Sequence, residues 1–182
     1  MEKIDRYRKS TIFSFNVTNT SILEWKKISS PTQSFFHFLP SDWKLELFPQ
    51  WPRLQHKCNV FALYETQVLQ SVGIVFEHTM PKLSWLEQQA HCYFTNGLYI
   101  AYFFTLPAYR NQSRARYWMD AIKKYHTNRT IWLTIEDVHL AEFYTKLGFR
   151  PFHLPSKSSS LSNKESQAND TNEFELVLYY EN

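Results

Sequence analysis

The sequence predicts an α/β (α+β) fold, with a mixed, mostly antiparallel sheet of six to seven strands and helices on both faces. Residues 98–105 are apolar on both faces, as in a central buried strand. Residues 59–65 and 68–77 read as two strands joined by a short turn, which predicts an antiparallel hairpin. From 98 to 154, apolar strands alternate with amphipathic helices, and this order favours parallel pairing through right-handed crossovers.

The N-terminal part carries both strand and helix signals. Residues 11–17 alternate apolar and polar side chains and are followed by Thr and Asn, which predicts a first strand. We expect residues 21–28 to start a helix, with Thr20 or Ser21 as its N-cap. A short helix is expected at 42–47, because flanking prolines interrupt any longer element.

Two further helices are expected in the middle of the chain. The segment between 78 and 96 is too long for a hairpin turn, so we expect a short helix around 83–89. A longer amphipathic helix follows Arg110. Its apolar face carries side chains at spacings of three and four, namely Ala115, Trp118, Met119, Ile122 and Tyr125.

The C-terminal part predicts three short strands and one helix. Residues 131–135, 149–154 and 174–180 are the expected strands. Asp137 is a natural N-cap for the helix between the first two of them. Gly148 fits the C′ position of that helix, where a left-handed backbone is needed.

Length and composition predict one domain spanning residues 1–182, in which the Ser-rich segment 155–171 forms a mobile loop. The net charge of +3 does not by itself indicate a nucleic-acid partner. Two cysteines make no disulfide framework, and no apolar run reaches the ~18 residues of a membrane helix. We therefore expect a cytoplasmic protein without a membrane partner.

The His and Cys residues lie in two groups, His56 with Cys58 and His91 with Cys92. Neither spacing matches the usual paired metal ligands, and adjacent side chains on a strand point apart. No metal site is expected from them.

Two segments carry the chemical signal. The strand 98–105 leads into Tyr109-Arg110-Asn111-Gln112-Ser113-Arg114-Ala115, which opens a helix. The second segment, 141–149, is a short helix with Tyr144 that ends in Gly-Phe. These segments resemble the two halves of the acetyl-coenzyme A site in the GNAT acetyltransferase superfamily. There, the first half reads Gln/Arg-x-x-Gly-x-Gly/Ala and the second ends in Tyr-x-x-x-Gly-Phe. The resemblance is best over residues 97–152.

The resemblance implies acetyl-CoA as the co-substrate. A loop that turns into a helix N-terminus supplies converging N–H groups and positive potential for the diphosphate. Pantetheine would lie between splayed parallel strands, 98–105 and 131–135, and pair with the first of them. The implied coenzyme contacts are Thr105, Arg110, Asn111, Gln112, Ser113, Arg114, Ala115 and Asp137.

Two of these positions depart from the family pattern. Ser113 stands where the family usually has Gly, and the site is compromised if φ there must be positive. Asp137 stands where many members have an Asn, so an acceptor is kept but the amide donor is lost. Residues 106–130 contain six Lys or Arg residues and one acid, Asp120. This excess of positive charge would attract phosphates.

Catalysis would place Tyr144 as the acid that protonates the departing thiolate. Many members carry a Glu base on the strand before the phosphate loop, but residues 98–109 contain no acid. The sequence leaves several substitutes open, namely Glu77, Glu65, His91, a water held by tyrosine hydroxyls, or an amine that arrives neutral.

The resulting hypothesis is an N-acetyltransferase that transfers acetyl from acetyl-CoA to a primary amine of a small molecule or protein by direct attack. One alternative is a catalytically weak or inactive acyl-CoA-binding or regulatory module, because the strand lacks an acid. Another is an acetyltransferase acting on charged tRNA, because the helix after Arg110 is basic. A final strand at the sheet edge would allow pairing across a homodimer.

Overall fold

The computed structural model describes residues 13–17, 21–28, 36–154 and 174–181. These residues form two compact units, the first within 1–81 and 100–127 and the second within 82–99 and 128–182. The expected loop at 155–171 lies outside the described residues. A mixed sheet, mostly antiparallel, with helices on both faces is confirmed.

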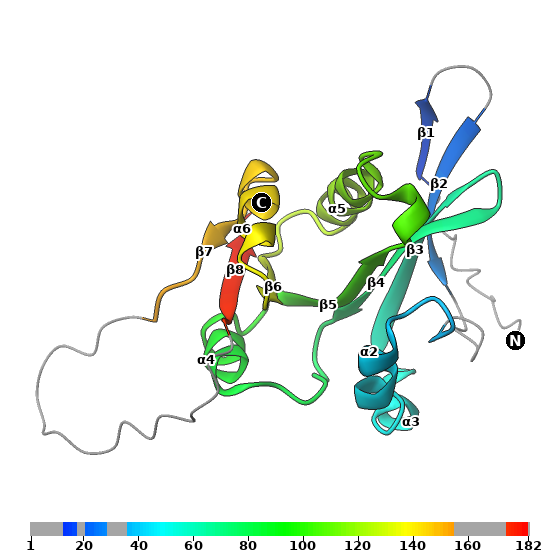
Figure 1. Ribbon diagram of the computed structural model, residues 1–182. Coiled ribbons are helices and arrows are strands. Elements are labelled where there is room, and N and C mark those ends of the chain that lie inside the picture. Colours follow the sequence, from blue (N-terminus) through cyan, green and yellow to red (C-terminus); the bar gives the residue numbers. More distant parts are fainter. Residues whose placement is uncertain (1–12, 18–20, 29–35, 155–173, 182) are drawn as a thin grey trace, which may run out of the picture. The chain divides into compact units, whose positions relative to one another are not determined.

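The first unit is built on an antiparallel meander followed by β5. Its strands run in the order β1 (Phe13–Val17), β2 (Ser21–Ile28), β3 (Cys58–Glu65), β4 (Val68–Phe76) and β5 (Leu98–Thr105). The β3–β4 hairpin predicted from the sequence is confirmed (Figure 1). Its turn residues Thr66 and Gln67 both have positive φ, 48° and 69°, as a tight type I′-like turn requires. β4 and β5 are antiparallel, because the Leu106 N–H donates to Gln70 O at 3.0 Å where β5 ends and β4 begins.

The expected helix at 21–28 is wrong, because these residues form strand β2. Leu23 and Trp25 are fully buried, whereas Ile22, which precedes them, is half exposed. This period of two suits a strand, and β2 pairs with β1 on one side and β3 on the other. β2 also raises the strand count of the described residues to eight, one above the predicted upper limit.

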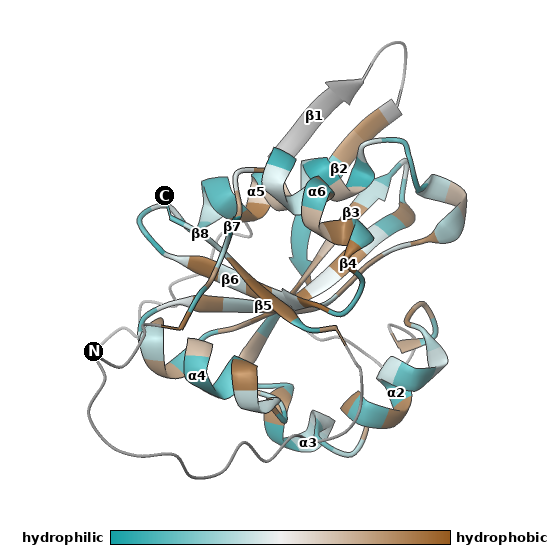
Figure 2. Ribbon diagram, turned by 60° about the vertical axis from the view of Figure 1, so that its left-hand side comes forward, coloured by the Kyte–Doolittle hydropathy of each residue, from teal (hydrophilic) through white to brown (hydrophobic). Residues whose placement is uncertain are grey.

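The helices of the first unit lie on both faces of its sheet (Figures 1 and 2). They are α2 (Ser41–Leu47), α3 (Trp51–Leu54), the short 3-10 helix η1 (Pro107–Tyr109) and α5 (Arg114–Tyr125). α2 confirms the short helix expected at 42–47, and α5 lies on the opposite face. α5 buries Trp118, Met119 and Ile122 as predicted, but Ala115 is half-buried and Tyr125 is exposed.

Gly73 of β4 explains how closely α5 approaches the sheet. A Cβ at this position would lie 2.6 Å from Trp118 Cζ2, so only glycine fits without a shift. The Trp118 indole N–H donates to Phe61 O at 3.0 Å, which satisfies the polar atom of this fully buried ring. This contact fixes α5 against β3 and β4.

The second unit is a smaller sheet between two helices. Its elements are α4 (Trp85–Tyr93), β6 (Ile131–Ile135), α6 (His139–Lys146), β7 (Arg150–Pro151) and β8 (Leu176–Tyr180). α4 and α6 lie on opposite faces of its strands in both views (Figures 1 and 2). β5 begins in this unit, where the Leu98 N–H donates to Thr130 O at 2.8 Å. β5 and β6 therefore start side by side, as parallel neighbours do.

The C-terminal strands correct two expectations. The strand predicted at 149–154 shrinks to the two residues of β7. β8 lies between β6 and β7 and is antiparallel to both, so β7 does not pair with β6. The final strand is therefore not at an edge, which removes the reason for pairing through it, while the homodimer itself stays a prediction.

The cores are rich in large rings, as the high aromatic content predicts. Trp25 stacks on Phe61 at 4.6 Å in the first unit, and Trp132 stacks on Tyr99 at 4.2 Å in the second. The apolar residues of the strands stand out in Figure 2. No helix in the described ranges combines the length and apolarity needed to cross a bilayer.

Candidate active site

β5 changes character along its length. Its first three residues are buried and the next five are half-buried, although β5 has neighbours on both sides in the strand order. Tyr102, in the middle of β5, has a φ of 53°. A non-glycine residue with positive φ inside a strand marks a bulge-like irregularity, which breaks the ladder and re-aims side chains. The C-terminal half of β5 is therefore distorted and partly accessible, and it leads directly to the predicted phosphate loop.

The predicted phosphate loop joins β5 to α5. Asn111 and Ser113 both have a φ of 60°, and Ser113 precedes the first residue of α5. The first backbone donor within α5 is the Tyr117 N–H, which reaches Ser113 O at 3.0 Å. The N–H groups of Arg114, Ala115 and Arg116 thus have no acceptor within the helix. Left-handed residues next to a helix start direct amides to one side, and this geometry suits an anion.

Side chains hold this loop against β5. The Arg110 Nε donates to Thr105 O at 3.2 Å, and its guanidinium lies 5.3 Å from the Phe104 ring. The Gln112 amide donates to Ala108 O at 3.0 Å. Asn111, Gln112 and Ser113 are exposed, as contacts to a ligand require. The structure therefore brings Thr105 and 110–115 together at one end of β5.

Arg114 has a role that the sequence did not indicate. Its guanidinium is buried and lies 2.7 Å from a Glu65 carboxylate oxygen at the end of β3. This ion pair ties the first residue of α5 to the hairpin. It also engages the carboxylate of Glu65, one of the candidate bases. Arg114 remains a predicted coenzyme contact, but the group still open to a ligand is its backbone N–H.

The remaining predicted residues lie in the second unit. The N-cap of α6 is Val138, one residue after the predicted Asp137, although the Asp137 carboxylate accepts the His139 N–H at 2.9 Å. Gly148 has a φ of 85°, and the Phe149 N–H reaches back to Tyr144 O at 3.0 Å, which confirms the glycine stop of the helix. Tyr144 is buried between the rings of Phe143 and Phe149, and this burial raises its pKa above the ordinary value. The phenol is therefore protonated near pH 7, and its role as the acid stays a prediction.

Two carboxylates near β5 were missed by the sequence analysis. The Tyr102 hydroxyl donates to a Glu46 oxygen at 3.1 Å, and the Tyr99 hydroxyl donates to Glu87. Glu87 is already engaged, because it forms a capping box with Ser84 at the start of α4. No sequence pattern could have found Glu46, because it lies 56 positions from Tyr102 in a different element.

The other candidate bases are less well placed. His91 packs near Trp132, with ring centroids 6.5 Å apart, and Glu77 lies 3.9 Å from His78. Burial raises the pKa of the Cys58 thiol to about 12, so this sulfur is not a thiolate near pH 7. Glu46 is thus the exposed carboxylate that contacts the distorted part of β5.

Comparison with known proteins decides the family. The sequence profile described as Acetyltransferase (GNAT) family matches residues 22–149, which is more than half of the chain. The chain belongs to the GNAT acetyltransferase family. No curated protein sequence matches it.

Solved structures share the GNAT fold at low identity. A probable acetyltransferase from Staphylococcus epidermidis is 13% identical with a TM-score of 0.57, covering 87% of this chain and 98% of its own. FeeM, an N-acyl amino acid synthase from uncultured soil microbes, is 12% identical with a TM-score of 0.57, covering 89% and 92%. A Bacillus subtilis acetyltransferase in complex with CoA is 12% identical with a TM-score of 0.54, covering 87% and 98%. At these identities the likeness concerns the fold alone.

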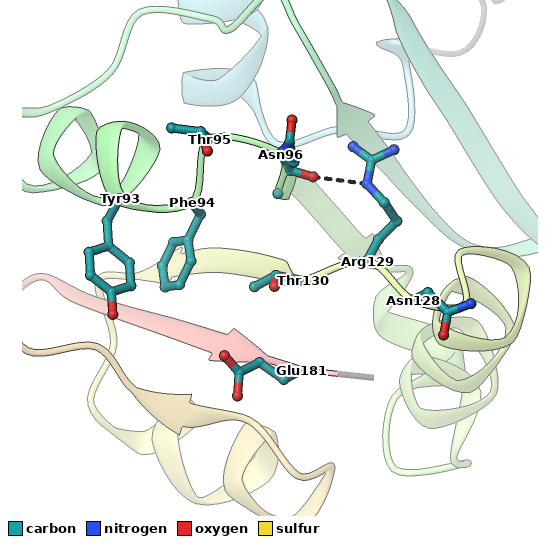
Figure 3. A pocket seen from close by; sticks show the side chains of 9 residues that line it. Tyr93, Phe94, Thr95, Asn96, Asn128, Arg129, Thr130 and Glu181 are labelled. Atoms are coloured by element: carbon teal, nitrogen blue, oxygen red, sulfur yellow. Dashed lines mark hydrogen bonds between the residues drawn. The ribbon is translucent and has the colours of Figure 1, made fainter.

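A cavity of about 420 Å³ lies elsewhere in the second unit of this GNAT protein (Figure 3). It is lined by 93–97, 128–130 and Glu181, where β5 and β6 begin. The Arg129 Nε donates to Asn96 O at 2.8 Å across its rim. None of the predicted coenzyme contacts lines this cavity, and the loop 110–115 follows the other end of β5.

Proposed function

We propose that the chain is an N-acetyltransferase that uses acetyl-CoA and a primary amine. The observation that supports this most directly is the loop at 110–116, where backbone amides without helical acceptors follow a distorted strand in a GNAT family member. The CoA complex of the Bacillus subtilis neighbour supports the choice of coenzyme.

The proposed coenzyme site uses backbone and side chains differently. The N–H groups of 114–116 bind the diphosphate, and Arg110 adds a charge-assisted contact. Asn111 and Gln112 line the same loop, and Thr105 marks where pantetheine begins to follow β5. Asp137 offers a carboxylate acceptor just before α6, although this group already accepts the His139 N–H.

The proposed reaction is a direct transfer. The neutral amine nitrogen attacks the thioester carbonyl carbon, the C–N bond forms and the C–S bond breaks. The departing thiolate takes the proton of the Tyr144 hydroxyl, and the amide nitrogen releases its surplus proton. Tyr144 regains a proton from solvent in the next cycle. Burial raises the pKa of this phenol, so it is protonated before the C–S bond breaks, but the same shift makes it a weaker acid than an exposed tyrosine.

A second candidate is an acyl-CoA-binding module without turnover. It is favoured by the absence of any acid in residues 98–109. Such a protein binds the coenzyme but transfers no acyl group to any amine. The two candidates therefore differ in turnover and agree in binding.

Thermal unfolding with acetyl-CoA tests the coenzyme site. A ligand at 100 times its Kd should add about 2.7 kcal/mol to the free energy of unfolding. Release of free thiol in the presence of an amine panel then separates the enzyme from the binding module. No shift at millimolar acetyl-CoA would contradict both candidates, and a shift without thiol release would favour the module. Propionyl- and octanoyl-CoA in the same assay would define the acyl preference.

A further inference from the structure

Three aromatic side chains form a wall beside the distorted half of β5. Trp43 of α2 lies edge-on to Tyr102 and Phe104, with ring centroids 5.9 Å and 6.1 Å apart. All three rings are half-buried, so they are not simply core. We call Trp43, Tyr102 and Phe104 the aromatic wall.

The aromatic wall carries a carboxylate. Glu46 lies three residues after Trp43 on α2, and side chains at this spacing share a helix face. Its carboxylate is exposed and accepts a hydrogen bond from the Tyr102 hydroxyl at 3.1 Å. One carboxylate oxygen is thus fixed by β5, and exposure leaves the group accessible to a ligand.

This combination selects positive charge. Aromatic faces attract cations, and a fixed carboxylate adds a direct ionic partner. The wall already holds one cation, because the Arg110 guanidinium lies 5.3 Å from the Phe104 ring. An anionic acceptor would meet both the Glu46 charge and the negative ring faces, so we expect it to bind more weakly than a cation.

We propose that the acceptor is a cationic primary amine with an apolar body, whose ammonium binds Glu46 and whose body packs on the aromatic wall. This inference rests on the proposed function, and it supplies the base that β5 lacks. The Glu46 carboxylate takes one ammonium proton, which leaves the neutral amine that attacks the thioester. Glu46 later gives this proton to solvent, so protons and charge balance over the cycle.

The test uses two probes of similar shape and opposite charge, 2-phenylethylammonium and 3-phenylpropionate. Binding of each is measured by calorimetry, with and without saturating CoA. We expect the cation to bind at least 10-fold more tightly than the anion. Trp43→Ala and Glu46→Gln should each weaken cation binding about 10-fold, and Glu46→Gln should also reduce the preference over the anion. Trp43→Phe, which keeps an aromatic ring, should restore most of the affinity.

Asp42→Asn is the matched control, because it also changes an exposed carboxylate of α2 into an amide. It should leave both affinities within twofold. Equal binding of the two probes, or no effect of Glu46→Gln and Trp43→Ala, would overturn the inference even if CoA binds normally. Failure of CoA to bind would instead contradict the proposed function, while the probe measurements still decide the amine site. With phenylethylamine as acceptor, Glu46→Gln should lower kcat/KM at least 10-fold.

Discussion

Ser113 holds a conformation that glycine adopts without steric cost. Its φ of 60° places Cβ near the following carbonyl, and for an L-residue this costs roughly 1–2 kcal/mol. Strained residues persist where the surrounding structure determines them, and they cluster at ligand sites. The family pattern places Gly at this position, so Ser113 keeps the backbone shape of the motif at a cost in stability.

Ser113→Gly should therefore change stability little. The relief of strain is offset by about 0.4–1 kcal/mol of added entropy in the unfolded chain. Ser113→Val, which is β-branched, should lose roughly 1–3 kcal/mol and most of the acetyl-CoA affinity. Urea unfolding and acetyl-CoA titration check both variants. A tenfold loss of affinity in Ser113→Gly would show that the hydroxyl itself contacts the coenzyme.

Tyr144 combines burial with a hydroxyl, and this predicts a separation of binding from turnover. Tyr144→Phe should lower kcat by about 10²-fold or more if the phenol is the general acid, with acetyl-CoA affinity within threefold. Tyr93→Phe is the matched control, because that ring belongs to the same unit and is 60% exposed. Unchanged turnover in Tyr144→Phe would remove the acid role.

The raised pKa of Tyr144 also predicts how stability depends on pH. Because burial favours the neutral phenol, its contribution is fully present below the unfolded pKa of about 10. It is lost as pH rises from there toward the higher pKa of the folded state. The wild type should therefore lose stability above pH 10, and Tyr144→Phe should lose less over the same range. Chemical unfolding at pH 9 and pH 11 measures the difference.

At the scale of elements, the start of α5 is fixed by two contacts of different kind. Trp118 fills the space above Gly73, and Arg114 pairs with Glu65 at the end of β3. The Arg114 and Glu65 side chains are only 9% and 19% exposed, so this pair is poorly solvated. The predicted phosphate loop is therefore positioned by the β3–β4 hairpin, because α5 cannot shift without breaking one of these contacts.

Glu65→Gln should be costly, because it leaves the Arg114 guanidinium buried without its anion. Breaking such a pair costs about 3 kcal/mol in the free energy of unfolding. Glu142→Gln breaks the exposed i,i+4 pair with Lys146, whose side chains are 64% and 78% exposed, and should cost far less. Denaturant unfolding compares the two. Equal costs would mean that the Arg114–Glu65 pair does not hold α5, and acetyl-CoA affinity should fall only in Glu65→Gln.

At the scale of the whole molecule, local sequence patterns predicted most helices and strands, but they did not predict which distant strands pair. The strands at 98–105 and 131–135 were predicted to the residue, because their apolar runs are bounded by turn signals. β2 was missed, because short apolar runs fit either period and its partner β3 begins thirty residues later. The insertion of β8 between β6 and β7 has no local signal.

The same division applies to the candidate site. The Ser113 loop and Tyr144 could be proposed from the sequence because each motif lies within a few residues. The Arg114–Glu65 and Tyr102–Glu46 contacts join residues 49 and 56 positions apart. Such contacts depend on strand order and on which helix covers which face, and no spacing within one segment encodes them.

Charge distribution is a property of the whole chain, and it predicts how salt acts on coenzyme binding. The net charge is only +3, and Glu65 already neutralises Arg114, so Arg110 and Arg116 are the exposed charges next to the loop. Raising salt from 50 to 500 mM should weaken acetyl-CoA binding, because exposed charges are screened beyond about 10 Å at 0.1 M.

Two variants with the same net charge separate local from overall attraction. Arg116→Gln should weaken acetyl-CoA binding by about 0.2–1 kcal/mol, up to about fivefold, and should flatten the salt dependence. Lys57→Gln removes one exposed charge just before β3, away from the loop in sequence, and should change neither. Titrations at four salt concentrations measure both slopes. If the two variants weaken binding equally, the net charge attracts the coenzyme and the loop has no electrostatic advantage. If neither does, the phosphates are held by backbone amides, whose dipoles salt screens far less at contact distance.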